Sequence, residues 1–243
     1  MIDTRLPLYQ QLRDDFLHRI QTGEWSPDAA LPSENELCES LGVAVGTVRK
    51  ALDVLVAEGV LVRQQGRGTF LRRASFDASL FRFFRHEDRE GRRRVPDSHI
   101  LSRRGLQADA GLADLLRLAP GEPVLGLNRL RRIDGEVVLV EEIRLPATRF
   151  ALLADLPIEE FGPLLYPLYE RLCGQIVTSA RESLAVATAN AEIAAHLGIA
   201  LGSPIVEIER LALDCTGQPI EWRRSWGGGP VPLSRRYSLI KFI

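Results

Sequence analysis

The chain has 243 residues, of which 45% are hydrophobic, so it is long enough for two domains that each bury a core. Its formal net charge is -1, which excludes a global positive field, so any DNA binding must depend on local basic patches. The three cysteines are odd in number and lack metal-ligand spacing, which excludes a disulfide framework. No apolar run reaches the roughly 18 residues of a membrane span, so we expect a cytoplasmic protein outside the membrane.

The first forty residues predict two helices. Residues 8–22 have apolar side chains at helical spacing, which predicts an amphipathic helix that covers a small core. Ser33 can cap a second helix, and Glu36 stands three residues later to complete a capping box. Gly42 is expected to end this helix, because glycine adopts the left-handed conformation of a helix end without strain.

A third helical pattern follows at once and has a free face. Its apolar residues repeat at helical spacing from Ala44 to Leu55 and predict one buried side. The residues on the other side are Gly46, Thr47, Arg49, Lys50 and Asp53. A second helix with a basic free face is typical of helix-turn-helix proteins, which insert it into the DNA major groove. The alternative is a small helical subdomain whose charges are merely solvated.

Two extended runs complete this part of the chain. Residues 61–65 and 69–71 predict strands, and Gly66, Arg67 and Gly68 between them predict a tight turn with a cation at its tip. The order of helix-turn-helix and then hairpin is that of a winged helix. In such a domain the wing contacts the DNA backbone or the minor groove.

Several motifs in this region stand in a recognisable order. They are Pro7-Leu8-Tyr9, Leu31-Pro32-Ser33-Glu34, Thr47-Val48-Arg49-Lys50-Ala51-Leu52, Glu58-Gly59 and Gly66-Arg67-Gly68-Thr69-Phe70. The sequence resembles the GntR family of bacterial transcription regulators. The free helix face, the wing and this resemblance together predict DNA contacts by Asn35, Gly46, Thr47, Arg49, Lys50, Gly66, Arg67 and Gly68. Asn35 and Val45 stand where the family usually has arginine, which reads guanine with two hydrogen bonds, so we expect an operator that departs from the family's guanine-rich half-site.

From residue 98 onward, extended runs alternate with short helical patterns. Strands are predicted at 98–103, 124–133, 137–145, 176–187, 204–213, 218–226 and 236–243, and helices at 109–116, 163–172 and 190–197. Turns at Asp134-Gly135 and Thr216-Gly217 make hairpins of the strands beside them. Successive hairpins predict a mainly antiparallel sheet with helices on one face, which is an α+β domain.

The first of these hairpins carries charged candidates for a ligand site. Arg129 and Arg131 stand at alternate positions, so their guanidinium groups share one face of the strand. A three-residue turn would place Glu141 opposite Arg129, whereas a two-residue turn would place it on the other face. Two interpretations stay open: an Arg–Glu ion pair on an exposed sheet face, and a site that binds an anionic ligand.

A second resemblance extends from about Phe76 to the C-terminus. Its motifs are Leu127-x-Arg129-x-Arg131, Asp134-Gly135, Leu145-Pro146, Leu197-Gly198, Gly217-Gln218-Pro219-Ile220-Glu221 and Arg236-Tyr237. They resemble the UTRA ligand-binding domain of the HutC subfamily, whose fold is similar to that of chorismate lyase. The resemblance implies effector contacts by Ser79, Arg129, Arg131, Glu141, Glu221 and Tyr237.

We therefore predict a winged helix-turn-helix domain at residues 1–72, a linker at 73–80 and an effector-binding domain at 81–243. We expect a homodimeric repressor that binds a pseudo-palindromic double-stranded DNA operator and responds to a small anionic effector. No nucleophile-base pair, metal cluster or phosphate-binding glycine loop is recognisable, so we expect no catalysis, metal or other cofactor. The alternatives are an enzyme of chorismate-lyase-like fold and a DNA-binding protein without a ligand.

Overall fold

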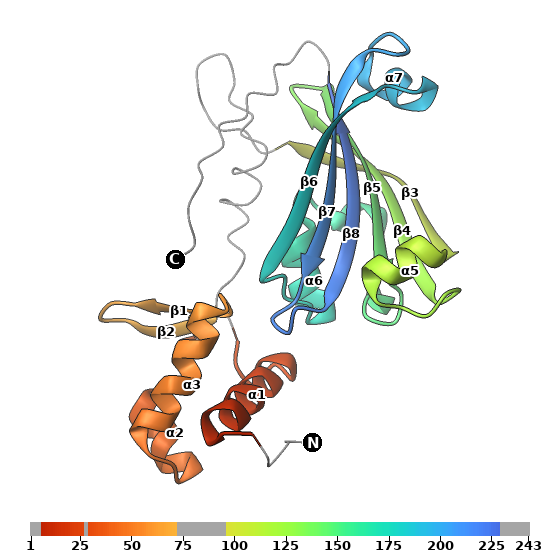
Figure 1. Cartoon of the computed structure of the whole chain (residues 1–243). Helices are drawn as coiled ribbons and strands as arrows, with labels where there is room; N and C mark the ends of the chain where they lie inside the picture. Colours follow the sequence, from red (N-terminus) through yellow and green to blue (C-terminus); the bar gives the residue numbers. More distant parts are fainter. Residues whose placement is uncertain (1–5, 27–28, 72–95, 229–243) are drawn as a thin grey trace. The chain divides into compact units, whose positions relative to one another are not determined.

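The computed structural model describes residues 6–26, 29–71 and 96–228 (Figure 1). These residues form two compact units, each of which is described by itself. Ser79, Tyr237 and the strand predicted at 236–243 lie outside the described residues. No helix in the described ranges is long and apolar enough to cross a membrane.

The N-terminal unit has the predicted order of helix-turn-helix and hairpin. Its elements are α1 (Leu8–Gln21), α2 (Glu34–Leu41), α3 (Val45–Ala57), β1 (Leu61–Gln64) and β2 (Gly68–Leu71). Ser33 and Glu36 form the predicted capping box at the start of α2, and Gly42 ends that helix with a φ of 65°. The strands β1 and β2 pair antiparallel around the glycine-flanked turn. The predicted winged helix is confirmed.

One apolar face of each helix closes the core of this unit. Val48, Leu52 and Leu55 of α3 are buried, and so are Phe16 of α1 and Leu37 of α2. The opposite face of α3 stays exposed, because its residues fall between the apolar positions of the helical repeat. The buried side of α3 therefore packs against the core, and its polar side is exposed to solvent.

The C-terminal unit is built on a six-stranded sheet in which all neighbouring strands are antiparallel. The strand order is β3-β4-β5-β8-β7-β6. The strands are β3 (Asp97–Gln107), β4 (Pro123–Ile133), β5 (Glu136–Pro146), β6 (Ser179–Thr188), β7 (Pro204–Leu213) and β8 (Pro219–Gly227). The prediction of an antiparallel α+β domain is confirmed.

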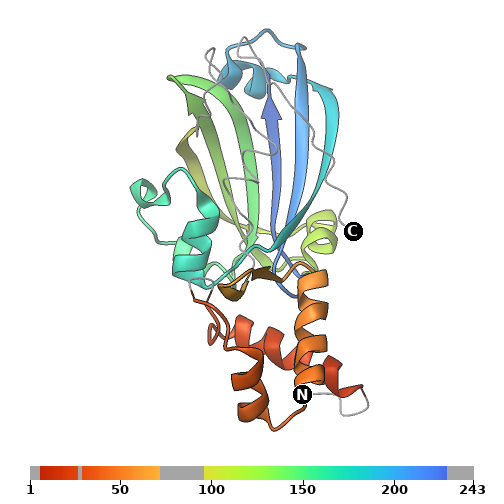
Figure 2. The same cartoon turned by 90° about the vertical axis from the view of Figure 1, so that its left-hand side faces the viewer.

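Helices lie on both faces of this sheet, and the expectation of one covered face is wrong (Figures 1 and 2). The helices are α5 (Ala110–Leu116), α6 (Leu165–Cys173) and α7 (Ala191–Leu197), with 3-10 turns at Ala151–Leu153 and Ile158–Phe161. Val124 and Trp222 pack against α5, and Leu130 and Val140 pack against α7. Val124 and Leu130 are six residues apart on β4, so α5 and α7 cover the same face of the sheet. Neighbouring strand residues alternate between faces, so Glu221, which bonds to α6, points to the other side. That polar face holds the candidate site.

Candidate functional sites

The register of the β4–β5 hairpin decides which side chains meet. The turn has two residues, Asp134 and Gly135, both with positive φ, and Ile133 pairs with Glu136. A β-bulge then shifts the register between Arg131 and Arg132. The bulge adds one residue on β5. It therefore puts Glu141 on the same face of the sheet as Arg129, where a two-residue turn without a bulge would have put it on the other face.

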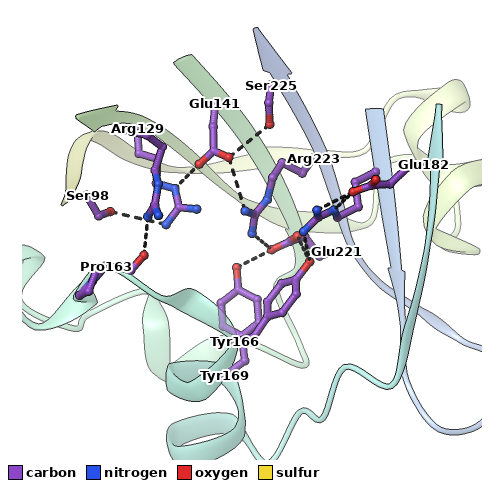
Figure 3. Close-up of polar contacts among 12 residues, drawn as sticks. Ser98, Arg129, Glu141, Pro163, Tyr166, Tyr169, Glu182, Glu221, Arg223 and Ser225 are labelled. Carbon is purple, nitrogen blue, oxygen red and sulfur yellow. Dashed lines mark hydrogen bonds and ion pairs between the residues drawn. The ribbon is translucent and has the colours of Figure 1, made fainter. Parts of the chain in front are cut away.

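Glu141 consequently lies directly opposite Arg129, which settles the alternative that the sequence left open. Its carboxylate accepts a hydrogen bond from Arg129 Nε, and Ser225 Oγ of β8 donates another at 3.2 Å (Figure 3). Arg129 also donates to Ser98 Oγ of β3 at 3.5 Å. Both charged groups are buried, so this is an interior ion pair and not a pair on an exposed face.

Glu221 is the centre of a second buried group on the same face. Its carboxylate accepts hydrogen bonds from Tyr166 at 3.0 Å and from Tyr169 at 2.8 Å, both on α6. Arg223 donates to Glu221 at 2.7 Å and approaches Glu141 to 3.5 Å, so it joins the two groups. The helix on this face is therefore fixed to the sheet through a buried carboxylate.

The network continues to the far edge of the sheet. Arg210 of β7 donates to the Tyr166 hydroxyl oxygen at 3.4 Å and pairs with Glu182 of β6 at 2.5 Å. Arg210 and Glu182 are opposite one another in the register, and both side chains are buried. A continuous set of ion pairs and hydrogen bonds thus crosses from β4 to β6.

Burial and the neighbouring charges shift the protonation equilibria of this network. Burial raises the pKa of both Tyr166 and Tyr169, and the Glu221 carboxylate adds to the effect, so both phenols stay neutral donors. For Glu141 burial favours the neutral acid, but Arg129 and Arg223 outweigh it and lower the pKa. The carboxylate therefore stays ionised at neutral pH.

Arg131 is the least compensated charge of the network. One of its Nη groups donates to the carbonyl oxygen of Pro163, while Nη2 is buried and has no hydrogen-bond partner among the described residues. Burial, and then the nearby Arg129, lower the pKa of Arg131 to about 9. A buried donor without an acceptor costs free energy, which an anion placed beside it would recover.

The charge balance supports the same conclusion. Among the described buried residues of the network, four guanidinium groups face three carboxylates. They are Arg129, Arg131, Arg210 and Arg223 against Glu141, Glu182 and Glu221. One positive charge remains in excess, and it lies in a place where water cannot screen it.

Four of the six predicted effector residues thus lie in one network, and the other two, Ser79 and Tyr237, are outside the described residues. The residues that sequence reasoning missed are Tyr166, Tyr169, Glu182, Arg210, Arg223 and Ser225. Arg223 and Ser225 could have been found, because they follow Glu221 at alternate positions of one strand. The tyrosines gave no such signal, because aromatic residues on an amphipathic helix usually fill a core.

The free face of α3 carries the predicted DNA contacts. Arg49 and Lys50 are exposed, Gly46 is exposed with open space around it, and Thr47 is half-buried. In the wing Arg67 is exposed. Gly66 and Gly68 flank it with φ values of 72° and 114°, which side chains rarely adopt. Asn35 is exposed on α2.

Each of the three cations has a partner within the unit, and that of Arg67 is the Phe70 ring, whose centre lies 6.0 Å from the Arg67 Cζ. Arg49 Nε donates to Glu34 at 2.9 Å, and Lys50 Nζ lies 4.2 Å from the centre of the Tyr9 ring. Arg63 of β1 also pairs with Glu34, at 3.2 Å. Sequence reasoning assigned none of Tyr9, Glu34 and Arg63 to the site. In the described part of the chain, no group of three or more acidic, histidine or cysteine side chains could hold a metal ion.

Comparisons with known proteins identify the family of each of the two parts of the chain. Residues 8–71 match the family of bacterial regulatory proteins of the gntR type, and residues 91–229 match the UTRA domain. The uncharacterized HTH-type transcriptional regulator YurK of Bacillus subtilis (strain 168) is 32% identical over 219 residues, which cover 88% of each chain. The HTH-type transcriptional repressor NagR of the same strain is 30% identical over 239 residues, which cover 98% of this chain and 95% of NagR.

Solved structures give the same result. PhnF from Mycobacterium smegmatis superposes with a TM-score of 0.53 at 28% identity, over 90% of this chain and 95% of PhnF. The ligand-binding domain of a protein assigned to the GntR-family regulators of Bordetella bronchiseptica superposes with a TM-score of 0.59 at 30% identity. This second match covers 65% of the present chain and 98% of that domain.

Proposed function

The chain belongs to the GntR family of bacterial transcription regulators and carries a UTRA domain, and on this basis we propose that it is a repressor released from its operator by a small anion. The family membership makes it a DNA-binding regulator with a domain for a small-molecule effector. The repression, the charge of the effector and the residues that bind it are our proposal.

The buried guanidinium edge of Arg131 is the observation that carries the choice of an anion. Phosphate and carboxylate groups accept two parallel hydrogen bonds from such an edge, in a geometry that lysine cannot copy. Arg129 stands two residues away on the same face and supplies further positive potential. Glu141 and Glu221 orient the arginines, and the family resemblance adds Ser79 and Tyr237 to the site.

For the DNA side we propose that Arg49 and Lys50 of α3 read the major groove while Arg67 in the wing contacts phosphates. The proposed domains are residues 1–72 for DNA binding, 73–80 as linker and 81–243 for effector binding. Two such chains are needed for a pseudo-palindromic operator, because each half-site takes one recognition helix.

The edge strand β6 supports a homodimer. It is ten residues long, pairs with β7 without a register shift and contains no proline, and its Val186 is 84% exposed. Natural edge strands are often interrupted by bulges, as β3 is after Ile100, whereas β6 is regular and carries one exposed charge, Arg181. We propose that β6 pairs with β6 of a second copy, antiparallel about a two-fold axis.

We propose no catalytic role for this protein, which would act in the cytoplasm on DNA. Each of the three buried carboxylates in the network is paired with an arginine. A carboxylate held in this way is a poor general base, because proton uptake would break its ion pair.

The test compares Arg131→Met with Arg104→Met, which removes an exposed guanidinium from the opposite face of the sheet. Fluorescence anisotropy follows a DNA duplex that the wild type selects from a random pool, during titration with a panel of sugar phosphates and carboxylates. We expect one class of anion to release the wild type and Arg104→Met but not Arg131→Met. Release of Arg131→Met at wild-type concentrations would refute the assignment, and failure of the wild type to select any duplex would refute DNA recognition.

A further inference from the structure

A single carboxylate lies between two arginines on the DNA-reading unit. Glu34, the first residue of α2, accepts from Arg49 Nε of α3 at 2.9 Å with one oxygen. Its other oxygen accepts from Arg63 Nη2 of β1 at 3.2 Å. The Glu34 side chain is 27% exposed. Glu34 therefore connects both helices of the helix-turn-helix to the wing.

The far side of this contact is fixed as well. Arg63 Nη1 pairs with Asp53 of α3 at 2.6 Å. Asp53 stands four residues after Arg49 on the same helix, so the side chains form a chain of contacts, Arg49–Glu34–Arg63–Asp53, that begins and ends on α3. The position of the Glu34 carboxylate is consequently set from two directions.

The contact uses only part of the Arg49 guanidinium group. Its Nε donates to Glu34, and no hydrogen bond within the described residues engages its two Nη groups. The side chain stays 58% exposed. Guanine presents O6 and N7 in the major groove, and an arginine reads them with two N–H donors of one fork. Arg49 thus keeps the donors that such a contact requires while its orientation is held by Glu34.

We propose that Glu34 is a positioning residue for base recognition, which holds Arg49 in the orientation that reads a guanine. This inference rests on the proposed role of Arg49 in DNA contact. An arginine that is free to rotate loses side-chain entropy when it binds, and a partner that fixes it beforehand lowers that cost. With Asn35 and Val45 in place of two arginines, Arg49 is the remaining α3 arginine on the free face, so its orientation decides most of the specificity.

The proposal predicts that removal of the Glu34 charge weakens specific DNA binding, whereas the charge alone would predict stronger binding. A carboxylate near DNA repels phosphates, so its removal should strengthen binding to every sequence. Loss of the positioning contact should instead weaken binding to the selected sequence alone. The ratio of specific to non-specific affinity separates these effects, because the general electrostatic contribution cancels in it.

The experiment compares Glu34→Gln with Glu39→Gln, which removes the same charge from an exposed position on the same helix. Affinities are measured for a duplex that the wild type selects from a random pool and for a scrambled duplex of equal length. We expect Glu34→Gln to lower the affinity ratio about fivefold, the upper range for an exposed ion pair, and Glu39→Gln to leave it unchanged. Thermal unfolding shows whether each variant is folded.

Arg49→Ala and the double variant complete the cycle. We expect Arg49→Ala to lower the ratio by about 5- to 150-fold, and Glu34→Gln to have no further effect on the ratio once Arg49 is absent. A wild-type ratio in Glu34→Gln, with the expected loss in Arg49→Ala, would overturn the inference and leave the DNA contact of Arg49 intact. An unchanged ratio in Arg49→Ala would overturn the proposed contact itself.

Discussion

Replacing Arg131 by methionine should stabilise the free protein, although it removes a buried group with a hydrogen bond. Burial and the neighbouring Arg129 lower the pKa of Arg131 to about 9, well below that of a free guanidinium group. At 1.36 kcal/mol for each pKa unit, this difference corresponds to an upper limit of about 5 kcal/mol for keeping the charge in place. Methionine has a similar length and no charge to desolvate.

The expected gain is smaller than this limit. The carbonyl oxygen of Pro163 loses its donor, at a cost of about 1 kcal/mol or more for an acceptor that water reaches only in part. Replacements of buried ionic groups by apolar ones in other proteins are neutral or stabilising by about 1–4 kcal/mol. We therefore expect Arg131→Met to raise the free energy of unfolding by about 1–3 kcal/mol at pH 7.

Urea unfolding, followed by tryptophan fluorescence, measures this difference, provided that the slope against denaturant is unchanged. The sign of the pH dependence follows from the lowered pKa of Arg131. Above pH 9 the folded arginine loses its proton before the unfolded one, so the wild type gains stability relative to the variant as the pH rises further. A variant that is less stable than the wild type by more than about 1 kcal/mol would refute the conclusion that this charge is uncompensated.

Three other substitutions test further parts of the argument. Glu141→Gln leaves the arginine Arg129 without its counter-ion and should destabilise the protein by about 3–5 kcal/mol at pH 7 in urea unfolding. Because the pKa of Glu141 is lowered in the folded protein, the ionised carboxylate stabilises the fold above about pH 4.3, and this contribution is lost at more acidic pH. The free energy of unfolding of Glu141→Gln should therefore fall less on acidification than that of the wild type. Arg67→Ala should lower the slope of log affinity against log salt by about 1 in anisotropy titrations, and an unchanged slope would remove the wing from phosphate contact. Val186→Lys should shift the protein toward monomer in analytical ultracentrifugation, whereas Leu152→Lys, equally apolar and 65% exposed, should not; a Val186→Lys dimer of wild-type affinity would exclude pairing through β6.

The sequence predicts the elements of this protein well where a local signal is strong. The capping box of Ser33 and Glu36 gives the start of α2, and the alternation of Arg129 and Arg131 gives their common face. These features depend on neighbours within a few residues, so no knowledge of the fold is needed.

Features that depend on distant partners could not be predicted in the same way. The bulge that brings Glu141 opposite Arg129 lies outside the Asp134-Gly135 turn, so the turn sequence does not reveal it. The pairing of Glu34 with Arg49 joins residues 15 positions apart on different helices. Likewise, Tyr166 belongs to the site because α6 lies on the polar face of the sheet, and the residues beside Tyr166 in the sequence do not indicate that position.

The excess charge also bears on how a signal could leave the proposed effector site. A ligand can shift a conformational equilibrium only by its different affinity for the two states. An anion that neutralises Arg131 weakens the repulsion between this arginine and its neighbours, and so changes the field at Glu141 and Arg223. These groups continue through Tyr166 to Glu182 on the edge strand β6, where we propose that the two chains meet. A site with a fully paired network would bind the same anion with less change in these contacts, so we propose that the unpaired charge, which costs stability in the free protein, also lets the proposed effector act at a distance.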